Sequence, residues 1–63
     1  MNQHRRDLNA TRIAELTAET ANCISIARAA ASIGDKDTAR ELIARADRCA
    51  AESRVYAAAN LRA

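Results

Sequence analysis

The residues with the most reactive side chains in this chain are its two cysteines, Cys23 and Cys49. Neither belongs to a Cys-x-x-Cys pair, and the single histidine, His4, lies far from both in the sequence, so the spacing does not predict a metal site. Two interpretations stay open: a pair of buried reduced thiols, or a disulfide between them. A cytosolic chain favours reduced thiols, and a disulfide needs Cα atoms within about 7 Å, closer than helices usually pack.

The other polar residues do not form the groupings that enzymes use. The sequence contains no Ser/His/Asp or Cys/His arrangement for nucleophilic catalysis, no converging pair of carboxylates on an apolar face, and no glycine-rich phosphate loop. A thin helical protein also offers little concave surface for a substrate. The sequence therefore predicts a non-enzymatic protein that uses neither a cofactor nor a metal.

The elements that position the two cysteines are long alanine-rich segments on either side of Gly34, the only glycine in a chain without proline. Small and apolar residues recur in each segment at steps of three and four, which is typical of amphipathic helices. Glycine ends a helix readily because it tolerates a positive φ. The sequence thus predicts an all-α fold, an antiparallel two-helix hairpin, in one domain over residues 1–63.

The capping signals predict where the helices begin and end. We expect a flexible basic arm at residues 1–6, a helix over about 7–33, a turn at 34–37 and a second helix over about 38–61. Thr38 and Glu41 have the spacing of a capping box, and Asp35 and Asp37 are alternative caps. Arg45 lies four residues after Glu41, where the two side chains can pair.

Folding the chain back at Gly34 predicts a register for the hairpin. Cys23 then lies level with Cys49, and Leu16 lies level with Tyr56. Large side chains mostly oppose small ones in this register, as close packing requires. The large side chains expected in the core or in a dimer interface are Ile13, Leu16, Ile24, Leu42, Ile43 and Tyr56.

The small size of the core predicts self-association. The chain has 63 residues, no Phe or Trp, and mostly alanine among its apolar residues, so a lone hairpin buries little apolar area. The apolar stripe of each segment is wider than the two-position seam of a simple coiled coil. A second small row on the later segment contains Ala44, Ala51, Val55 and Ala58, and it is either a docking face or alanine filling exposed helical sites. We therefore expect a homodimer, a four-helix bundle.

Charge and hydropathy indicate where this protein works and what it binds. The net charge of +2 is too small to indicate nucleic acid, and the arginines alternate with acidic residues. The longest apolar run is Ala29–Ala31, far short of the ~18 residues of a membrane span. The first residues lack the apolar stretch of a signal peptide. A cytoplasmic protein with no membrane partner is expected.

Two resemblances bear on the architecture. The turn region, with Ile33-Gly34-Asp35 followed by Ala39, Ile43 and Ala46, resembles the centre of a tetratricopeptide-type repeat over about 20 residues. Longer helices and the lack of a second copy mean that this resemblance does not imply a repeat array. In size and layout, without a sequence match, the chain is similar to the repressor-of-primer type of plasmid protein. That resemblance implies a hairpin that dimerises and binds paired RNA loops.

The interpretation that fits these features best is a small protein-interaction module. We expect a regulator or inhibitor, encoded by a phage or plasmid, that covers a surface of a larger protein such as a transcription factor. The surface residues expected to contact that partner are Arg48, Arg54, Val55, Leu61 and Arg62. The alternatives are an RNA-binding regulator, whose affinity would fall steeply with salt, and a purely structural subunit that assembles with itself.

Overall fold

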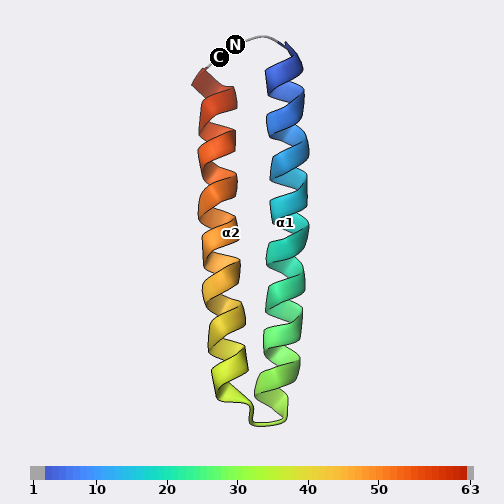
Figure 1. The fold of residues 1–63 in the computed structure, drawn as a ribbon, viewed down its shortest axis with the longest axis vertical. Coiled ribbons are helices and arrows are strands. Elements are labelled where there is room, and N and C mark those ends of the chain that lie inside the picture. Colours follow the sequence, from blue (N-terminus) through green and yellow to red (C-terminus); the bar gives the residue numbers. More distant parts are fainter. Residues whose placement is uncertain (1–2, 63) are drawn as a thin grey trace.

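A computed structural model describes residues 3–62, which form two antiparallel helices, α1 (Gln3–Ser32) and α2 (Lys36–Arg62), joined by a short turn (Figure 1). This confirms the all-α two-helix hairpin. The molecule is a rod with extents of 48 × 14 × 11 Å. One end of the rod is the turn, and we call the other end, where α1 begins and α2 finishes, the open end (Figure 1).

Gly34 is the residue that allows α1 to end. Its φ is 82°, in the left-handed region that residues with a side chain rarely adopt. The Gly34 N–H donates to the Ala31 carbonyl at 3.0 Å, and the Asp35 N–H donates to the Ala30 carbonyl at 2.9 Å. These two bonds form a Schellman motif, which satisfies carbonyls that the end of a helix would otherwise leave without a partner.

Asp35 then caps the start of α2. Its side-chain Oδ1 accepts a hydrogen bond from the Thr38 N–H at 3.2 Å, and its carbonyl accepts one from the Ala39 N–H at 3.2 Å. The expected capping box of Thr38 with Glu41 is therefore wrong, and Asp35, one of the alternatives, is the N-cap. One residue thus serves both the end of α1 and the start of α2, which makes the turn short.

The helix boundaries differ from the expected ones at both ends of the rod. The turn covers residues 33–35 rather than 34–37, because α2 begins at Lys36. Residues 3–6, expected in a flexible arm, belong to α1, and residues 1 and 2 of that arm lie outside the described residues. The first turn of α1 is anchored to α2, since the Asn60 side-chain amide donates to the Arg6 carbonyl at 3.2 Å.

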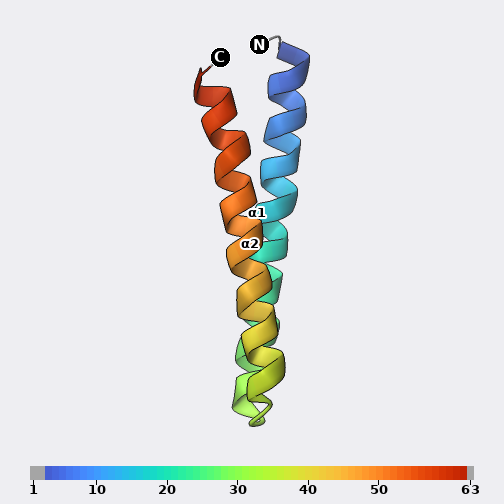
Figure 2. The same ribbon diagram turned by 60° about the vertical axis from the view of Figure 1, so that its left-hand side comes forward.

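The two helices meet along a narrow seam whose positions repeat every seven residues. Every seam position is buried or half-buried, with steps that alternate between three and four. The seam consists of Asn9, Ile13, Leu16, Thr20, Cys23, Ala27 and Ala30 in α1 and of Ala39, Leu42, Ala46, Cys49, Ser53, Tyr56 and Asn60 in α2. Such a repeat is typical of a left-handed coiled coil, and the helices cross at a shallow angle (Figure 2).

The register of the seam differs from the expected one by three residues. The expected register, with Leu16 level with Tyr56, would put Asn9 level with residue 63. Instead the Asn9 side-chain Nδ2 donates to Oδ1 of Asn60 at 2.9 Å. Extended along both helices, this register places Leu16 level with Ser53 and Tyr56 level with Ile13. The physical reason is the short turn: α2 begins earlier than expected, so each α2 residue moves toward the open end relative to α1.

The core of the hairpin contains few large side chains. Leu16 is 1% exposed and is the only side chain among the described residues with less than 2% exposure. The other buried apolar residues are Cys23, Ala27, Ala30, Ala46 and Cys49. Of the remaining expected core residues, Ile13, Ile24, Leu42 and Tyr56 are half-buried, and Ile43 is exposed. The hairpin alone therefore covers only the narrow seam, and the wider apolar stripe of each helix stays partly in contact with solvent.

Hydropathy sets a limit on how the described helices can meet a lipid bilayer. Over residues 3–62, no helix is both long and apolar enough to cross a membrane.

Candidate functional site

The two cysteines lie in the seam as free thiols. Both are buried, and the register puts Cys49 level with Thr20 and Cys23 level with Ala46, so the sulfur atoms belong to adjacent layers. Burial raises the pKa of the Cys49 thiol, and the nearby Glu19 carboxylate and Cys23 raise it further, against a smaller lowering by Arg45. Of the two sequence-based interpretations, the reduced pair is the one found in the structure. Cys49 is held in the protonated, unreactive form.

The raised pKa predicts how Cys49 reacts and how it affects stability. Alkylation of Cys49 by iodoacetamide in the native protein should be slow at neutral pH and should accelerate only above the ordinary thiol pKa of 9.0. Because the folded protein prefers the thiol form, the Cys49 contribution to stability is complete below that ordinary value. It is lost as the pH rises through the folded pKa. The measurement is mass spectrometry of the alkylated Cys49 peptide after labelling at a series of pH values.

The control for this labelling is the same protein in concentrated urea, where Cys49 should react with an ordinary pH profile. Equal native and unfolded rates at every pH would contradict the protected, thiol-form cysteine.

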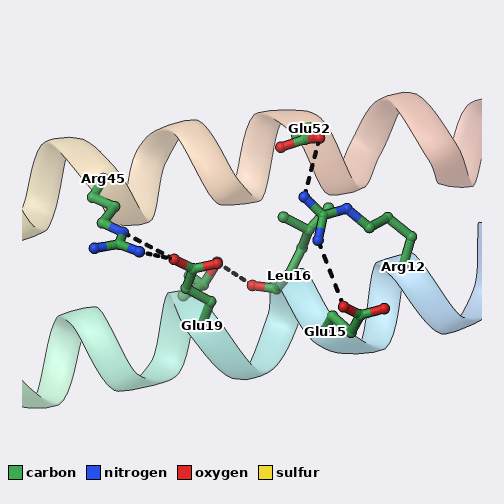
Figure 3. A network of polar contacts seen from close by, with 7 residues as sticks. Arg12, Glu15, Leu16, Glu19, Arg45 and Glu52 are labelled. Atoms are coloured by element: carbon green, nitrogen blue, oxygen red, sulfur yellow. Dashed lines mark hydrogen bonds and ion pairs between the residues drawn. The ribbon is translucent and has the colours of Figure 1, made fainter.

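One side of the seam carries ion pairs between the helices, and we call it the ionic flank. Arg45 donates from Nε to Glu19 Oε1 at 2.9 Å, and Arg12 Nη2 lies 3.5 Å from Glu52 Oε1 (Figure 3). Glu15, in the helix that carries Arg12, lies 3.7 Å from the Arg12 guanidinium (Figure 3). These side chains are 36–60% exposed, so solvent screens the pairs and each contributes little to the stability of the fold. Their larger effect is to close this side of the seam with charge.

The opposite side of the seam carries charge only at Lys36, the first residue of α2, and along its edges, and we call it the apolar flank. It consists of the seven-residue rows next to the seam: Ala10, Thr17, Ile24 and Ala31 in α1, and Ile43, Ala50 and Ala57 in α2. Thr17 donates its hydroxyl to the Ile13 carbonyl at 2.8 Å, which satisfies its polar group within α1. Ile43 is 44% exposed on this flank. The apolar flank therefore carries mostly small, apolar side chains, and the hairpin itself does not cover it.

A shallow groove in the turn half of the rod shows that both helices contribute to the apolar flank. Its lining residues come from α1 and α2 together: Ile24, Ala27, Arg28, Ala31, Ala39 and Ile43. Only Arg28, at the rim, carries a charge. Ile24 and Ile43 are the largest residues of the flank and lie on opposite helices at nearly the same level. Toward the open end, the residues of the flank are alanine and threonine only.

The residues expected to contact a larger partner lie on two rows of α2 away from the seam. Arg48, Val55 and Arg62 are spaced by seven residues and form one outer row, on which Val55 is 65% exposed. Arg54 and Leu61 form another row, next to the apolar flank, on which Leu61 is 88% exposed. The structure thus separates these five residues into two groups.

Several cross-helix contacts were not expected from the sequence. Arg45 pairs with Glu19 rather than with Glu41, and Asn9 pairs with Asn60. The Asn9–Asn60 pair leaves a signal, since both asparagines occupy seam positions that are otherwise apolar or small. The sequence gives no such signal for the ion pairs. They form only in the observed register, and shifting one helix by three residues along the other would separate their charges.

Between Gln3 and Arg62, no three His, Cys, Asp or Glu side chains are grouped so as to hold a metal ion.

Comparison of the chain with protein-family models, with curated proteins and with solved structures finds no match. Its fold and its two unlike flanks therefore provide the only basis for assigning it a function.

Proposed function

We propose that this chain is a non-enzymatic, cytoplasmic interaction module that forms a homodimeric four-helix bundle and regulates a larger protein. The observation that carries the proposal is the uncovered apolar flank, in which Ile43 remains 44% exposed beside Ile24. In a four-helix bundle each helix contacts two neighbours and buries such a flank in addition to its seam. The ionic flank supports the same choice of surface, because burying its charges would be costly.

The energetics of the single hairpin also support dimerisation. Below about 70–80 residues a single core rarely supplies more than about 3–5 kcal/mol, and this core has one fully buried large side chain. Covering the apolar flank with a second copy would bury Ile43, which the hairpin leaves exposed, and the rest of the half-buried Ile24.

Two matched variants test the proposed dimer. Wild-type protein should show twice the chain mass of 6.8 kDa in light scattering after size exclusion. Ile43→Glu should shift the protein to monomers, because it places a charge in the buried interface. Ile26→Glu is the control: Ile26 is 53% exposed but lies on the ionic flank, so this variant should remain a dimer. A monomeric wild type, or equal dissociation of both variants, would refute the proposed interface.

The larger protein partner is assigned to the outer row of Arg48, Val55 and Arg62, which neither the seam nor the apolar flank uses. Arginine is common in the energetically important part of interfaces, and an exposed valine between two arginines supplies an apolar centre. Val55→Glu should abolish capture of the partner from the native host while leaving the dimer intact. Partner capture that is unchanged by Val55→Glu would remove the outer row from the proposal, and a dimer that captures nothing would favour a purely structural subunit.

RNA binding is the less favoured alternative. Arg12, Arg40 and Arg45 each lie beside a carboxylate, which leaves fewer arginines for phosphate than the composition indicates. An affinity for RNA that fell steeply with salt would support it instead.

A further inference from the structure

We propose that the two hairpins of the dimer pack with their turns at opposite ends, so that α1 lies on α1 and α2 on α2 across the two-fold axis. This inference rests on the proposed dimer and names its arrangement. Two symmetric arrangements bring the apolar flanks together: turns at opposite ends, or turns at the same end. In both, neighbouring helices are antiparallel, so the helix dipoles do not discriminate between them. The charges at the edge of the flank and the sizes of its residues do.

The edge of the apolar flank is formed by one further row on each helix, and these rows carry charge. The row of α1 contains Asp7, Ala14, Ala21 and Arg28, and the row of α2 contains Arg40, Asp47, Arg54 and Leu61. Within residues 3–62, Arg28, Asp47 and Arg54 form no ion pair, and Asp7 accepts only a hydrogen bond from the Gln3 amide, at 2.8 Å. These charges are therefore free to pair with those of a second copy.

With the turns at opposite ends, the charges of this edge are complementary. Asp7 and Arg28 lie equally far from the midpoint of α1, so centring two copies places Asp7 of each level with Arg28 of the other. In α2, Asp47 and Arg54 lie on either side of the same two-fold axis. Asp47 of each copy therefore approaches Arg54 of the other. Two-fold symmetry makes each of these attractions occur twice.

With the turns at the same end, α1 instead faces α2 of the second copy, and the edge becomes repulsive. The hairpin register then puts Arg28 of each copy level with Arg40 of the other. Like charges so placed disfavour this arrangement.

The sizes of the flank residues favour the same choice. With turns at opposite ends, Ile24 of one copy faces the space between Ala10 and Ala14 of the other, and Ile43 faces Ala57 and Leu61. Apart from the contact of Ile43 with Leu61, large residues then meet small ones, which keeps the helix spacing even. With turns at the same end, Ile24 meets Ile43 and alanine meets alanine, so one end would be forced apart and the other left underpacked. In the favoured arrangement Arg54 and Leu61 are interface residues, and the outer row of each copy remains exposed.

Charge reversal at Arg28 distinguishes the two arrangements by the sign of its effect. With turns at opposite ends, Arg28→Asp faces Asp7 of the second copy, and we expect the dimer dissociation constant to rise roughly five- to tenfold at low salt. The double variant Asp7→Arg/Arg28→Asp exchanges the two charges and should restore the wild-type affinity. Arg48→Asp, the same charge change on the outer row, is the control and should have little effect. The measurement is sedimentation equilibrium, with circular dichroism to establish that each variant is helical.

The outcomes separate the arrangement from the dimer itself. A protein that is monomeric at every concentration refutes the proposed dimer. A dimer that Arg28→Asp tightens, through relief of the Arg28–Arg40 repulsion, keeps the dimer and overturns the arrangement with opposite turns. A dimer in which the double variant does not recover overturns the Asp7–Arg28 contact and, with it, this arrangement.

Discussion

Replacing Leu16 with alanine should leave the protein largely unfolded at room temperature. Leu16 is 1% exposed, and the rest of the buried core consists of alanine and cysteine side chains that cannot expand to fill the cavity. Buried Leu→Ala substitutions cost about 2.7–5 kcal/mol. A core of this size rarely supplies more than about 3–5 kcal/mol, so one such loss removes most of the stability. Urea unfolding followed by circular dichroism measures the effect.

The matched control for this variant is Ile33→Ala. Ile33 is 81% exposed in the turn and lies outside the proposed dimer interface, so deleting the same number of atoms there should change the stability by less than about 0.5 kcal/mol. Both variants must be compared at one protein concentration, because a dimer is stabilised by mass action. A Leu16→Ala protein that unfolds at the same urea concentration as Ile33→Ala would contradict the placement of Leu16 at the centre of the core.

Asn60→Leu should destabilise the protein although it adds apolar surface. Asn9 is 6% exposed, and its side-chain Nδ2 donates to Asn60 Oδ1 at 2.9 Å, a bond that leucine cannot accept. Losing that acceptor in a buried site costs about 1–3 kcal/mol. The Asn60 amide also donates to the Arg6 carbonyl at 3.2 Å, so the first turn of α1 should fray in this variant. Urea unfolding and hydrogen exchange of the α1 amides measure the two effects.

The double variant Asn9→Leu/Asn60→Leu separates stability from register. It should be more stable than Asn60→Leu, because both polar groups are replaced together by apolar ones. It should also lose the single register, since a polar layer in a coiled coil favours the one alignment that pairs its polar groups. NMR spectra should then show more than one amide peak for many residues. A destabilised double variant with one sharp set of peaks would show that the asparagines contribute stability rather than register.

The seam explains why the helices were predictable and their alignment was not. Apolar spacing depends only on neighbours in the sequence, so the residues that face the partner helix, from Ile13 to Tyr56, could be identified without coordinates. The alignment depends on the length of the turn, and three residues could have capped α2. With Asp35 rather than Thr38 as the cap, the turn is shorter. As a result, Leu16 lies level with Ser53 instead of Tyr56.

The difference between the ionic flank and the apolar flank depends on that alignment of the helices. Glu19 can reach Arg45, and Arg12 can reach Glu52, only when the helices have this register, so the ionic flank was not foreseen. Ile24 and Ile43 were expected in the core or in a dimer interface, and they flank a seam too narrow to bury both sides of each helix. Most of the residues that widen the apolar stripes lie on the apolar flank, whereas Ile26 lies on the ionic flank.

By itself, the sequence determined that this protein is a helical hairpin that turns at Gly34, because a positive φ and helical periodicity are properties of short segments. Only the tertiary structure decided which residues meet across the seam and that one flank is charged and the other apolar. The physical reason is that contacts between helices depend on how far one helix slides along the other. That distance is set by the few hydrogen bonds of the turn and by the asparagine pair at the open end.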